Sequence, residues 1–520
     1  MAVFVTLLLS LICLWPLTQA WFHRDDFWLL TLARYTANPV DFWTYDHSAF
    51  YFFRPFAMTL WWLSVALLGI DPLSHYVLNT LLHFLVAVSF GWWIRLLTSS
   101  KAVAVVAMLL YAVHPIAVRT TLWLSDRFDL LATASVFAAC ALFLSPSTTA
   151  WRRPALCAMA WCAVFSKESG FALPILILIH FAFRCRNSAA ATNGINRRRM
   201  KFDLLWVGAL AAVAVFWRWL LLSSRGVPIL DEAVSQTIAE GAHAYLRAFS
   251  TSIFGIFNLA SSGIGTILVL VAAVVIIRGV RVFSLRAALA GREAYCLGTA
   301  LMLFCLAIHA PIAAQNLGAD AVAEYVPAVR IFHLALAAPF IMIAVPLTRF
   351  VANASRTTHM TVALGVSVLL AIATVQSHRF AQAWVSSTNG PTKQTITAAV
   401  SAIARADLPY ACRIMVTGLT TDASEFREAS DVMVKAISQA PAERLLGCVV
   451  LTDRAPHFSL VARNLCAREP WRPLQPIHPL VQPHPFGTLC YQFFAMPDDA
   501  ALKLDKNAIW INLAPPVDPL

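Results

Sequence analysis

Long apolar segments are the feature that most constrains how this chain of 520 residues can fold. A helix that crosses a membrane needs roughly 20 mostly apolar residues. Segments of this kind recur from the N-terminus to residue 377, and we predict eleven membrane-spanning helices from them. They cover residues 2–22, 74–96, 102–118, 128–145, 154–166, 170–184, 203–222, 262–278, 294–311, 329–348 and 359–377. The sequence therefore predicts an all-α polytopic membrane domain over residues 1–385.

One further apolar segment, residues 54–70, is interpreted as a helix that lies at the membrane interface. It is short, it begins with Arg54-Pro55, and Trp61 and Trp62 suit the headgroup level. Counting it as a span would also break the alternation of loop charges across the membrane.

The positions of the charged residues test the eleven-span topology. Only 13% of the residues are charged, against about 25% in a soluble protein, which excludes disordered and small disulfide-rich classes. The formal net charge is +12. With a cytoplasmic N-terminus, 16 of the 27 Lys and Arg residues before residue 390 fall in cytoplasmic loops, as the positive-inside rule expects. The basic excess is therefore interpreted as a determinant of orientation, and no nucleic-acid partner is predicted.

The first span is predicted to be retained in the protein. The alternative is a cleaved signal peptide that ends at Thr18-Gln19-Ala20. The segment has no basic residue at its start, and Trp15-Pro16 is unusual for a signal peptide, so the retained helix is preferred.

The composition changes after the last span. A Ser-, Thr- and Gly-containing stretch at residues 386–392 predicts a linker, and residues 393–520 are predicted to form a small α/β domain. Eleven spans place this domain in the periplasm, so we predict a multi-pass protein of the bacterial inner membrane. The expected elements are strands at 413–418, 446–452, 488–495 and 508–513, and a helix at 423–440. Two disulfides or buried free thiols remain alternatives for its four cysteines, Cys412, Cys448, Cys466 and Cys490.

Two adjacent carboxylates, Asp25 and Asp26, begin the first outer loop at residues 21–73. A carboxylate that loses solvation at the bilayer boundary holds a proton more readily and can act as a general base. The alternative is that both residues cap a helix beside the membrane, where acidic side chains favour the positive end of the helix dipole.

A second group of charges is predicted at the same outer level. Arg127 and Asp129 follow the third span, and Lys167-Glu168 lies at the turn between two short spans. Arg127 and Lys167 could bind a lipid phosphate there. The alternative is that these two cations form structural ion pairs with Asp129 and Glu168, or extend to the interface.

Other polar residues of the apolar region fall into three groups. Arg218 lies inside a span and is expected to face the bundle or a wet cavity, because an unpaired Arg there is costly. Glu324-Tyr325 and Arg330, beside the tenth span, could complete the outer site. Single histidines on apolar faces are expected to be packed. This group comprises His83, His180, His309 and His333.

The order of these features carries a resemblance. The stretches FRPFAMTLWWLSVALLGIDPLSHYVLNTLLHFLVA, AVVAMLLYAVHPIAVRTTLWLSDRFDLLA and FSKESGFALPILILIHF follow the acidic pair in turn. This arrangement resembles the membrane half of the transmembrane-and-tetratricopeptide O-mannosyltransferases. That family belongs with the protein O-mannosyltransferases in the GT-C superfamily. The likeness is strongest over residues 20–185 and extends weakly to residue 385, whereas the tail does not resemble tetratricopeptide repeats.

The resemblance implies a glycosyltransferase whose donor is a polyprenyl-phosphate-linked sugar. The acceptor would be a hydroxyl group of a periplasmic protein, lipopolysaccharide or another glycan. The family's base in the first outer loop falls on Asp25 or Asp26, with Asp25 preferred, and its action inverts the anomeric centre. Arg127, Lys167 and Arg330 are the candidates for holding the donor phosphate. No metal or other cofactor is required by this interpretation.

Further positions match family motifs that shape the cavity. They are Arg54, His75, Asn79, His83, His114, Glu168, Glu324 and Tyr325. The sequence departs from the family pattern at Arg119, where a Glu is usual, and at Glu324-Tyr325, where an Arg is missing and Arg330 is the candidate replacement. Alternative functions are a polymerase or ligase of lipid-linked glycans, a lipid or solute transporter without chemistry, and an inactive homologue that scaffolds partners.

Overall fold

The computed structural model describes most of the apolar region and four strands of the tail. The described residues are 1–23, 26, 29–30, 33, 36, 38–44, 53–187, 194–223, 289–316, 333–353, 355–386, 393, 413–417, 449–452, 493–495 and 508–512. The chain divides into two compact units. The first comprises Met1–Thr18, Arg54–Ala57 and Tyr76–Gln382, and the second comprises Gln19–Phe53, Met58–His75 and Ala383–Leu520.

Helices make up the described part of the first unit, although the end residues of some of them belong to the second unit. Those before residue 150 are α1 (Ala2–Leu14), η1 (Trp15–Gln19), α5 (Pro72–Thr98), α6 (Lys101–Ala112), α7 (Pro115–Leu122), η2 (Leu124–Asp126) and α8 (Arg127–Leu144). Those after it are α9 (Arg152–Ser166), η3 (Glu168–Phe171), α10 (Ala172–Asn187), α11 (Gly194–Ser223), α14 (Leu289–Asn316), η9 (Leu334–Leu336), α15 (Ala337–Asn353) and α16 (Arg356–Trp384).

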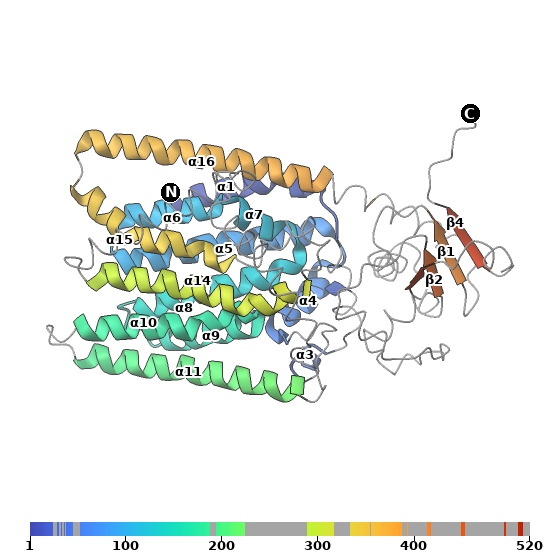
Figure 1. The fold of residues 1–520 in the computed structure, drawn as a ribbon, viewed down its shortest axis with the longest axis horizontal. Helices are drawn as coiled ribbons and strands as arrows, with labels where there is room; N and C mark the ends of the chain where they lie inside the picture. The colour runs from blue at the N-terminus through green and yellow to red at the C-terminus, as the bar shows by residue number, and fades with distance from the viewer. Residues whose placement is uncertain are drawn as a thin grey trace. The chain divides into compact units, whose positions relative to one another are not determined.

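These helices pack side by side as a bundle (Figure 1). Helix α8 packs against α9, α9 against α11, α10 against α14, and α14 against α15. Aromatic rings fill the contact between α5, α6 and α8, where the Phe90 ring lies 5.0 Å from Phe137 and 5.2 Å from Tyr111, centroid to centroid. Long apolar side chains of α11 and α16 remain exposed, as expected for helices that face lipid.

Polar side chains fix where several helices begin. The Asp71 carboxylate accepts hydrogen bonds from the Ser74 amide at 2.9 Å and the Ser74 hydroxyl at 2.6 Å, which caps α5. The hydroxyl bond lowers the pKa of Asp71 from its ordinary value. Ser100 caps α6 in the same way, because its hydroxyl accepts the Val103 amide at 3.3 Å.

Seven helices in the described ranges are long and apolar enough to cross a membrane, or eight if one bent pair counts as a span. They correspond to the predicted spans at 2–22, 74–96, 128–145, 170–184, 203–222, 294–311 and 359–377. The predicted span at 262–278 lies outside the described residues. Helix α9 has 15 residues, and the apolar helix over Leu334–Thr348 is also short, so the total of eleven stays a prediction.

The prediction of one continuous helix over residues 102–118 is wrong. Helix α6 ends at Ala112, α7 begins at Pro115, and the two are bent by 48°. Pro115 has no N–H group and excludes the helical conformation from the residue before it. His114 is accordingly extended and caps α7, because its Nδ1 accepts the Ile116 amide at 3.2 Å.

In the second unit, the described helices are α3 (Asp41–Thr44) and most of α4 (Pro55–Leu68). The 14 residues of α4 are shorter than a membrane crossing. The Trp61 side chain does not face lipid, because it is fully buried and stacks on His75 with ring centroids 5.7 Å apart. The location of residues 54–70 at the membrane interface stays a prediction. Trp62 is half-buried, and its indole N–H donates to the Thr36 carbonyl at 2.9 Å.

The tail contains a four-stranded parallel sheet. Its strands are β1 (Arg413–Thr417), β2 (Val449–Thr452), β3 (Phe493–Ala495) and β4 (Ala508–Asn512), in the order β3-β2-β1-β4. Ile414 pairs with Val450 on one side and with Ile509 on the other. Each strand lies within one of the four predicted strand segments, while the predicted helix at 423–440 and the four tail cysteines lie outside the described residues. The small α/β domain as a whole stays a prediction.

Glycine 170 allows the turn between α9 and α10 to pack closely, which gives a first prediction. A Cβ atom at Gly170 would overlap the Ala163 carbonyl, which is backbone and cannot move aside. We expect Gly170→Ala to lower the free energy of unfolding by about 1–3 kcal/mol, the usual cost of overpacking. Gly208→Ala is the matched control, because a Cβ there meets nothing within 4 Å and Ala favours a helix. Equal thermal stability of both variants in detergent would contradict this packing.

Candidate functional site

The candidate site begins at the N-terminal end of α4, where Arg54 meets Glu168 of η3. Arg54 donates from Nη2 to Glu168 Oε2 at 2.6 Å and from Nε to the same oxygen at 3.2 Å. The guanidinium also lies over the Phe128 ring, 5.3 Å from its centroid. A planar fork that binds a carboxylate through two N–H groups is held more firmly than a single contact would hold it.

Glu168 has a second cationic partner from a distant helix. Arg218 of α11 donates from Nη2 to Glu168 Oε1 at 2.8 Å. The side chains of Arg54, Glu168 and Arg218 are 10%, 11% and 21% exposed. The expectation that Arg218 faces the bundle is therefore confirmed, and one carboxylate joins two arginines that lie 164 positions apart in the chain.

Lys167, the residue before Glu168, forms a buried ion pair with Asp129 of α8. Its backbone is extended between α9 and η3, so that Lys167 and Glu168 reach different partners. This is one of the two structural pairings that we considered as an alternative to phosphate binding. Glu168, the other acid of those alternatives, pairs with Arg54 and Arg218.

Arg127, the first residue of α8, is fully buried. Its Nε donates to the Asn79 side-chain oxygen at 2.8 Å, and the Asn79 amide nitrogen lies 3.5 Å from the Leu124 carbonyl. Asn79 thus connects α5 to the start of α8. We call the set Arg54, Asn79, Arg127, Asp129, Lys167, Glu168 and Arg218 the cation cluster. It gathers four basic side chains, two carboxylates and one amide, which come from α5, α8, η3, α11 and the residues just before α4 and η3.

The histidines predicted to shape the site each contact a backbone group. His83 Nε2 lies 2.8 Å from the Ala112 carbonyl, and His75 Nε2 lies 3.0 Å from the Gly69 carbonyl. A carbonyl only accepts, so each of these nitrogens carries the proton. His114 serves as the helix cap described above. These contacts are structural, and a role for the three histidines in a cavity stays a prediction.

The packed histidine His180 has polar partners that the sequence did not indicate. The Trp93 indole N–H donates to His180 Nε2 at 3.0 Å, and His180 Nδ1 lies 2.6 Å from Glu293 Oε1. An indole nitrogen only donates, so Nε2 must accept and Nδ1 carries the proton toward Glu293. His333 is also buried, and its Nδ1 lies 3.2 Å from the Thr133 hydroxyl. The side chain of His309 belongs to the part of the chain that the structure does not describe.

Asp26 belongs to the second unit, where it has a helix-capping role. Its side chain is fully buried, and Oδ2 accepts the His23 amide at 2.9 Å. The Asp26 amide donates back to the His23 carbonyl at 3.0 Å. A side chain that accepts the amide three residues earlier makes one of the two hydrogen bonds of a capping box. For Asp26 the capping alternative is therefore present in the structure.

Four predicted site residues lie outside the described residues, namely Asp25, Glu324, Tyr325 and Arg330. Arg119, at which the sequence departs from the family motif, lies over the Phe380 ring at 5.1 Å from its centroid. Within the described ranges, no three His, Cys, Asp or Glu side chains are grouped as metal ligands are. The prediction that no metal is required stays a prediction.

Comparison with known proteins finds similarity among solved structures. No protein-family model matches the chain, and no curated protein matches it. A crystal structure of the Archaeoglobus fulgidus oligosaccharyltransferase, in complex with zinc and sulfate, aligns with a TM-score of 0.43 and 15% identity. The alignment covers 84% of this chain and 61% of that chain, so this chain spans about three fifths of that protein's length. Similarity at this level does not establish a common fold, and membership of the GT-C superfamily stays a prediction.

The two ion pairs of Glu168 give the second prediction. Glu168→Gln keeps the shape of the side chain but leaves the Arg54 and Arg218 charges without their carboxylate. We expect the free energy of unfolding to fall by about 1.5–3 kcal/mol, the range for hydrogen bonds to charged groups. Asp71→Asn is the control, because it makes the same acid-to-amide change at an exposed helix cap where Asn serves equally well. Similar thermal stability of the two purified variants would show that Glu168 does not hold the cluster together.

Proposed function

We propose that this protein is a membrane glycosyltransferase that moves a sugar from a polyprenyl-phosphate donor to a hydroxyl acceptor. The observation that carries the proposal is the cation cluster, in which Arg54, Arg127, Lys167 and Arg218 are gathered among apolar helices. Ionisable groups in such surroundings are expensive to bury, and they mark a site of function more often than a structural accident.

The chemistry of the donor explains why such a cluster is useful. A polyprenyl chain does not leave the bilayer, so its enzyme must bind the phosphate beside the membrane. Sugar transfer breaks the bond between the anomeric carbon and the phosphate oxygen, and negative charge on the leaving phosphate increases as it does so. Arginine and lysine side chains held in place before the reaction stabilise that charge. Arg127 and Lys167 are the proposed phosphate ligands, with Arg330 as a further candidate from the sequence.

A base must remove the acceptor proton while the new bond forms at the opposite face of the anomeric carbon. We assign this role to Asp25. Asp26 is the weaker candidate, because its Oδ2 already accepts the His23 amide. The acceptor oxygen then bonds to the anomeric carbon, its proton passes to Asp25, and polyprenyl phosphate leaves with the bonding electrons. The anomeric configuration is inverted.

The resemblance to O-mannosyltransferases supports the donor class and the position of the base. We further propose the bacterial inner membrane as the location and a periplasmic protein, lipopolysaccharide or other glycan as the acceptor. The tail at residues 393–520 is the proposed acceptor-selecting domain, because it is the part without resemblance to the family.

Substitution of the two aspartates gives the third prediction. We expect Asp25→Asn to reduce sugar transfer in membranes by about 10²–10⁴-fold, the usual loss when a general base is removed. Asp26→Asn should keep most of the activity, because the Asn oxygen can still accept the His23 amide. Asp26→Ala should lose about 1 kcal/mol of stability together with the cap.

Glycan mass spectrometry of a deletion strain complemented with each variant supplies the measurement. The strain complemented with the unmodified chain identifies the sugar and the acceptor, and the variants are compared with it at equal protein levels. Full glycan modification by Asp25→Asn would remove the assigned base. Loss of modification in Asp26→Asn alone would transfer that role to Asp26.

A further inference from the structure

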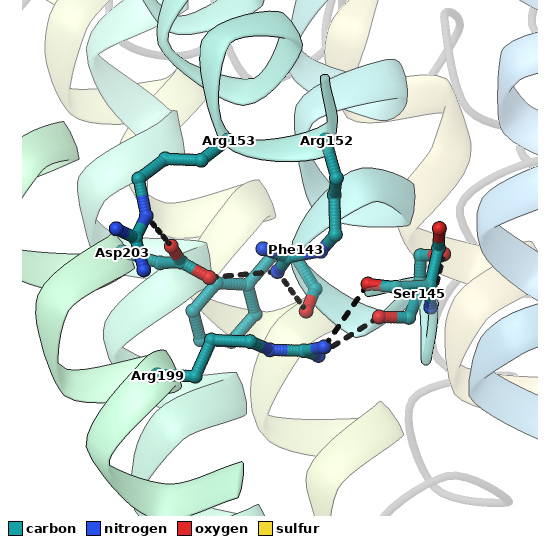
Figure 2. A network of polar contacts seen from close by, with 7 residues as sticks. Phe143, Ser145, Arg152, Arg153, Arg199 and Asp203 are labelled. Carbon is teal, nitrogen blue, oxygen red and sulfur yellow. Dashed lines mark hydrogen bonds and ion pairs between the residues drawn. The ribbon is translucent and has the colours of Figure 1, made fainter. Parts of the chain in front are cut away.

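A second charged network joins the end of α8 to the N-terminal parts of α9 and α11 (Figure 2). Asp203 of α11 is fully buried, and its Oδ2 lies 2.7 Å from Arg152 Nη2. Its other oxygen accepts the Arg153 Nε–H at 3.2 Å. The proposed glycosyl transfer uses none of these residues.

The arginines of this network also close the C-terminal end of α8. Arg152 Nη2 donates to the Phe143 carbonyl at 3.1 Å, and Arg199 donates to the carbonyls of Ser145 at 2.8 Å and Ser147 at 3.2 Å. The carbonyls at the end of a helix carry the negative end of its dipole. These bonds hold the guanidinium groups in fixed orientations around Asp203, as Figure 2 shows.

Positive charge remains in excess after this pairing. Within residues 152–153 and 197–203, six basic residues accompany one carboxylate. The basic residues are Arg152, Arg153, Arg197, Arg198, Arg199 and Lys201. The Arg153 side chain is 47% exposed, and Arg197, Arg198 and Lys201 are exposed as well. The junction is therefore open to an anion from outside.

Two buried N–H groups of the junction have no acceptor among the residues that the structure describes. The Nε atoms of Arg152 and Arg199 are buried and have no hydrogen-bond partner among the described residues. The Arg152 side chain is 5% exposed. Buried donors of this kind are rare in folded proteins because they lose their hydration without replacement. A phosphate group brings several acceptor oxygens and would compensate for that loss.

The junction lies where two candidate membrane spans end. The span of η2 and α8 finishes at Leu144, and the span of α11 begins at Arg197. Aromatic side chains stand beside the charges, since Trp151 is 80% exposed and the Arg198 guanidinium lies 5.9 Å from the centroid of the exposed Phe202 ring. Arginine next to an exposed tryptophan at the end of a span is typical of the lipid headgroup level.

We propose that this junction binds the phosphate of an anionic phospholipid. Arg153 and Arg199 hold the phosphate, Asp203 orients Arg152 and Arg153, and Trp151 lies against the lipid. Basic pockets between membrane helices are suited to such headgroups. A diffuse attraction between surface lysines and the membrane would need no buried aspartate, whereas this junction has one that positions two arginines.

Native mass spectrometry of the purified full chain in detergent tests the proposal, with phosphatidylglycerol and phosphatidylcholine as probes. We expect the protein to prefer phosphatidylglycerol by about tenfold, which is the effect of one or two charge-assisted hydrogen bonds. Arg153→Gln/Arg199→Gln should abolish the preference, and the single variant Arg153→Gln, at a half-exposed position that tolerates substitution, should weaken it. Lysine at either position should restore part of it.

Arg95→Gln/Lys101→Gln is the matched control, because it removes two exposed charges of another loop. It should keep the preference for phosphatidylglycerol. If this control lost the preference to the same extent, the proposal would be overturned in favour of diffuse attraction. If Arg153→Gln/Arg199→Gln kept the preference unchanged, the assignment of these two residues would be overturned. Inorganic phosphate is the third probe. Saturable binding of it that displaces phosphatidylglycerol would show that free phosphate, and not lipid, is the occupant.

Discussion

A charge buried among apolar helices must have a partner, and this constraint determines much of the first unit. Moving a charged group out of water raises the free energy by more than packing lowers it, unless an opposite charge or several hydrogen bonds replace the lost hydration. Glu168 meets this requirement for Arg54 and Arg218, Asp129 for Lys167, and Asn79 bonds Arg127. Each of these contacts also ties together elements that are distant in the sequence. The same residues thus hold the bundle together and concentrate positive charge.

Asp26 shows how a structural contact bears on the choice between the two adjacent aspartates proposed as the base. Both follow the first span, and both carry the same functional group. Asp26 forms hydrogen bonds with the backbone of His23, as a residue that starts a helix does. A carboxylate oxygen that already accepts a backbone N–H is less available to take a proton. This bond disfavours Asp26 as the proposed base, and the assignment to Asp25 stays a proposal.

The sequence predicted local features well and long-range contacts poorly. Runs of β-branched and aromatic residues identified all four strands of the tail, because a buried strand is defined by a few consecutive side chains. Long apolar segments located the helices, but the segment over 102–118 concealed the break at His114-Pro115. The burial of Trp61 was not foreseen, because composition cannot distinguish an exposed tryptophan from one stacked on His75. The partners of Glu168 and Asp203 could not be read from the sequence, since Arg54 and Arg152 lie 114 and 51 positions away.

Binding of undecaprenyl phosphate, compared with undecaprenol, tests most directly whether the cation cluster recognises a lipid-linked phosphate. The two probes share the same hydrocarbon chain and differ only in the phosphate group. The account predicts that the purified full chain binds the phosphate form at least about tenfold more tightly, and that Arg127→Gln removes this difference. Equal affinity of the unmodified protein for the two probes would contradict the account.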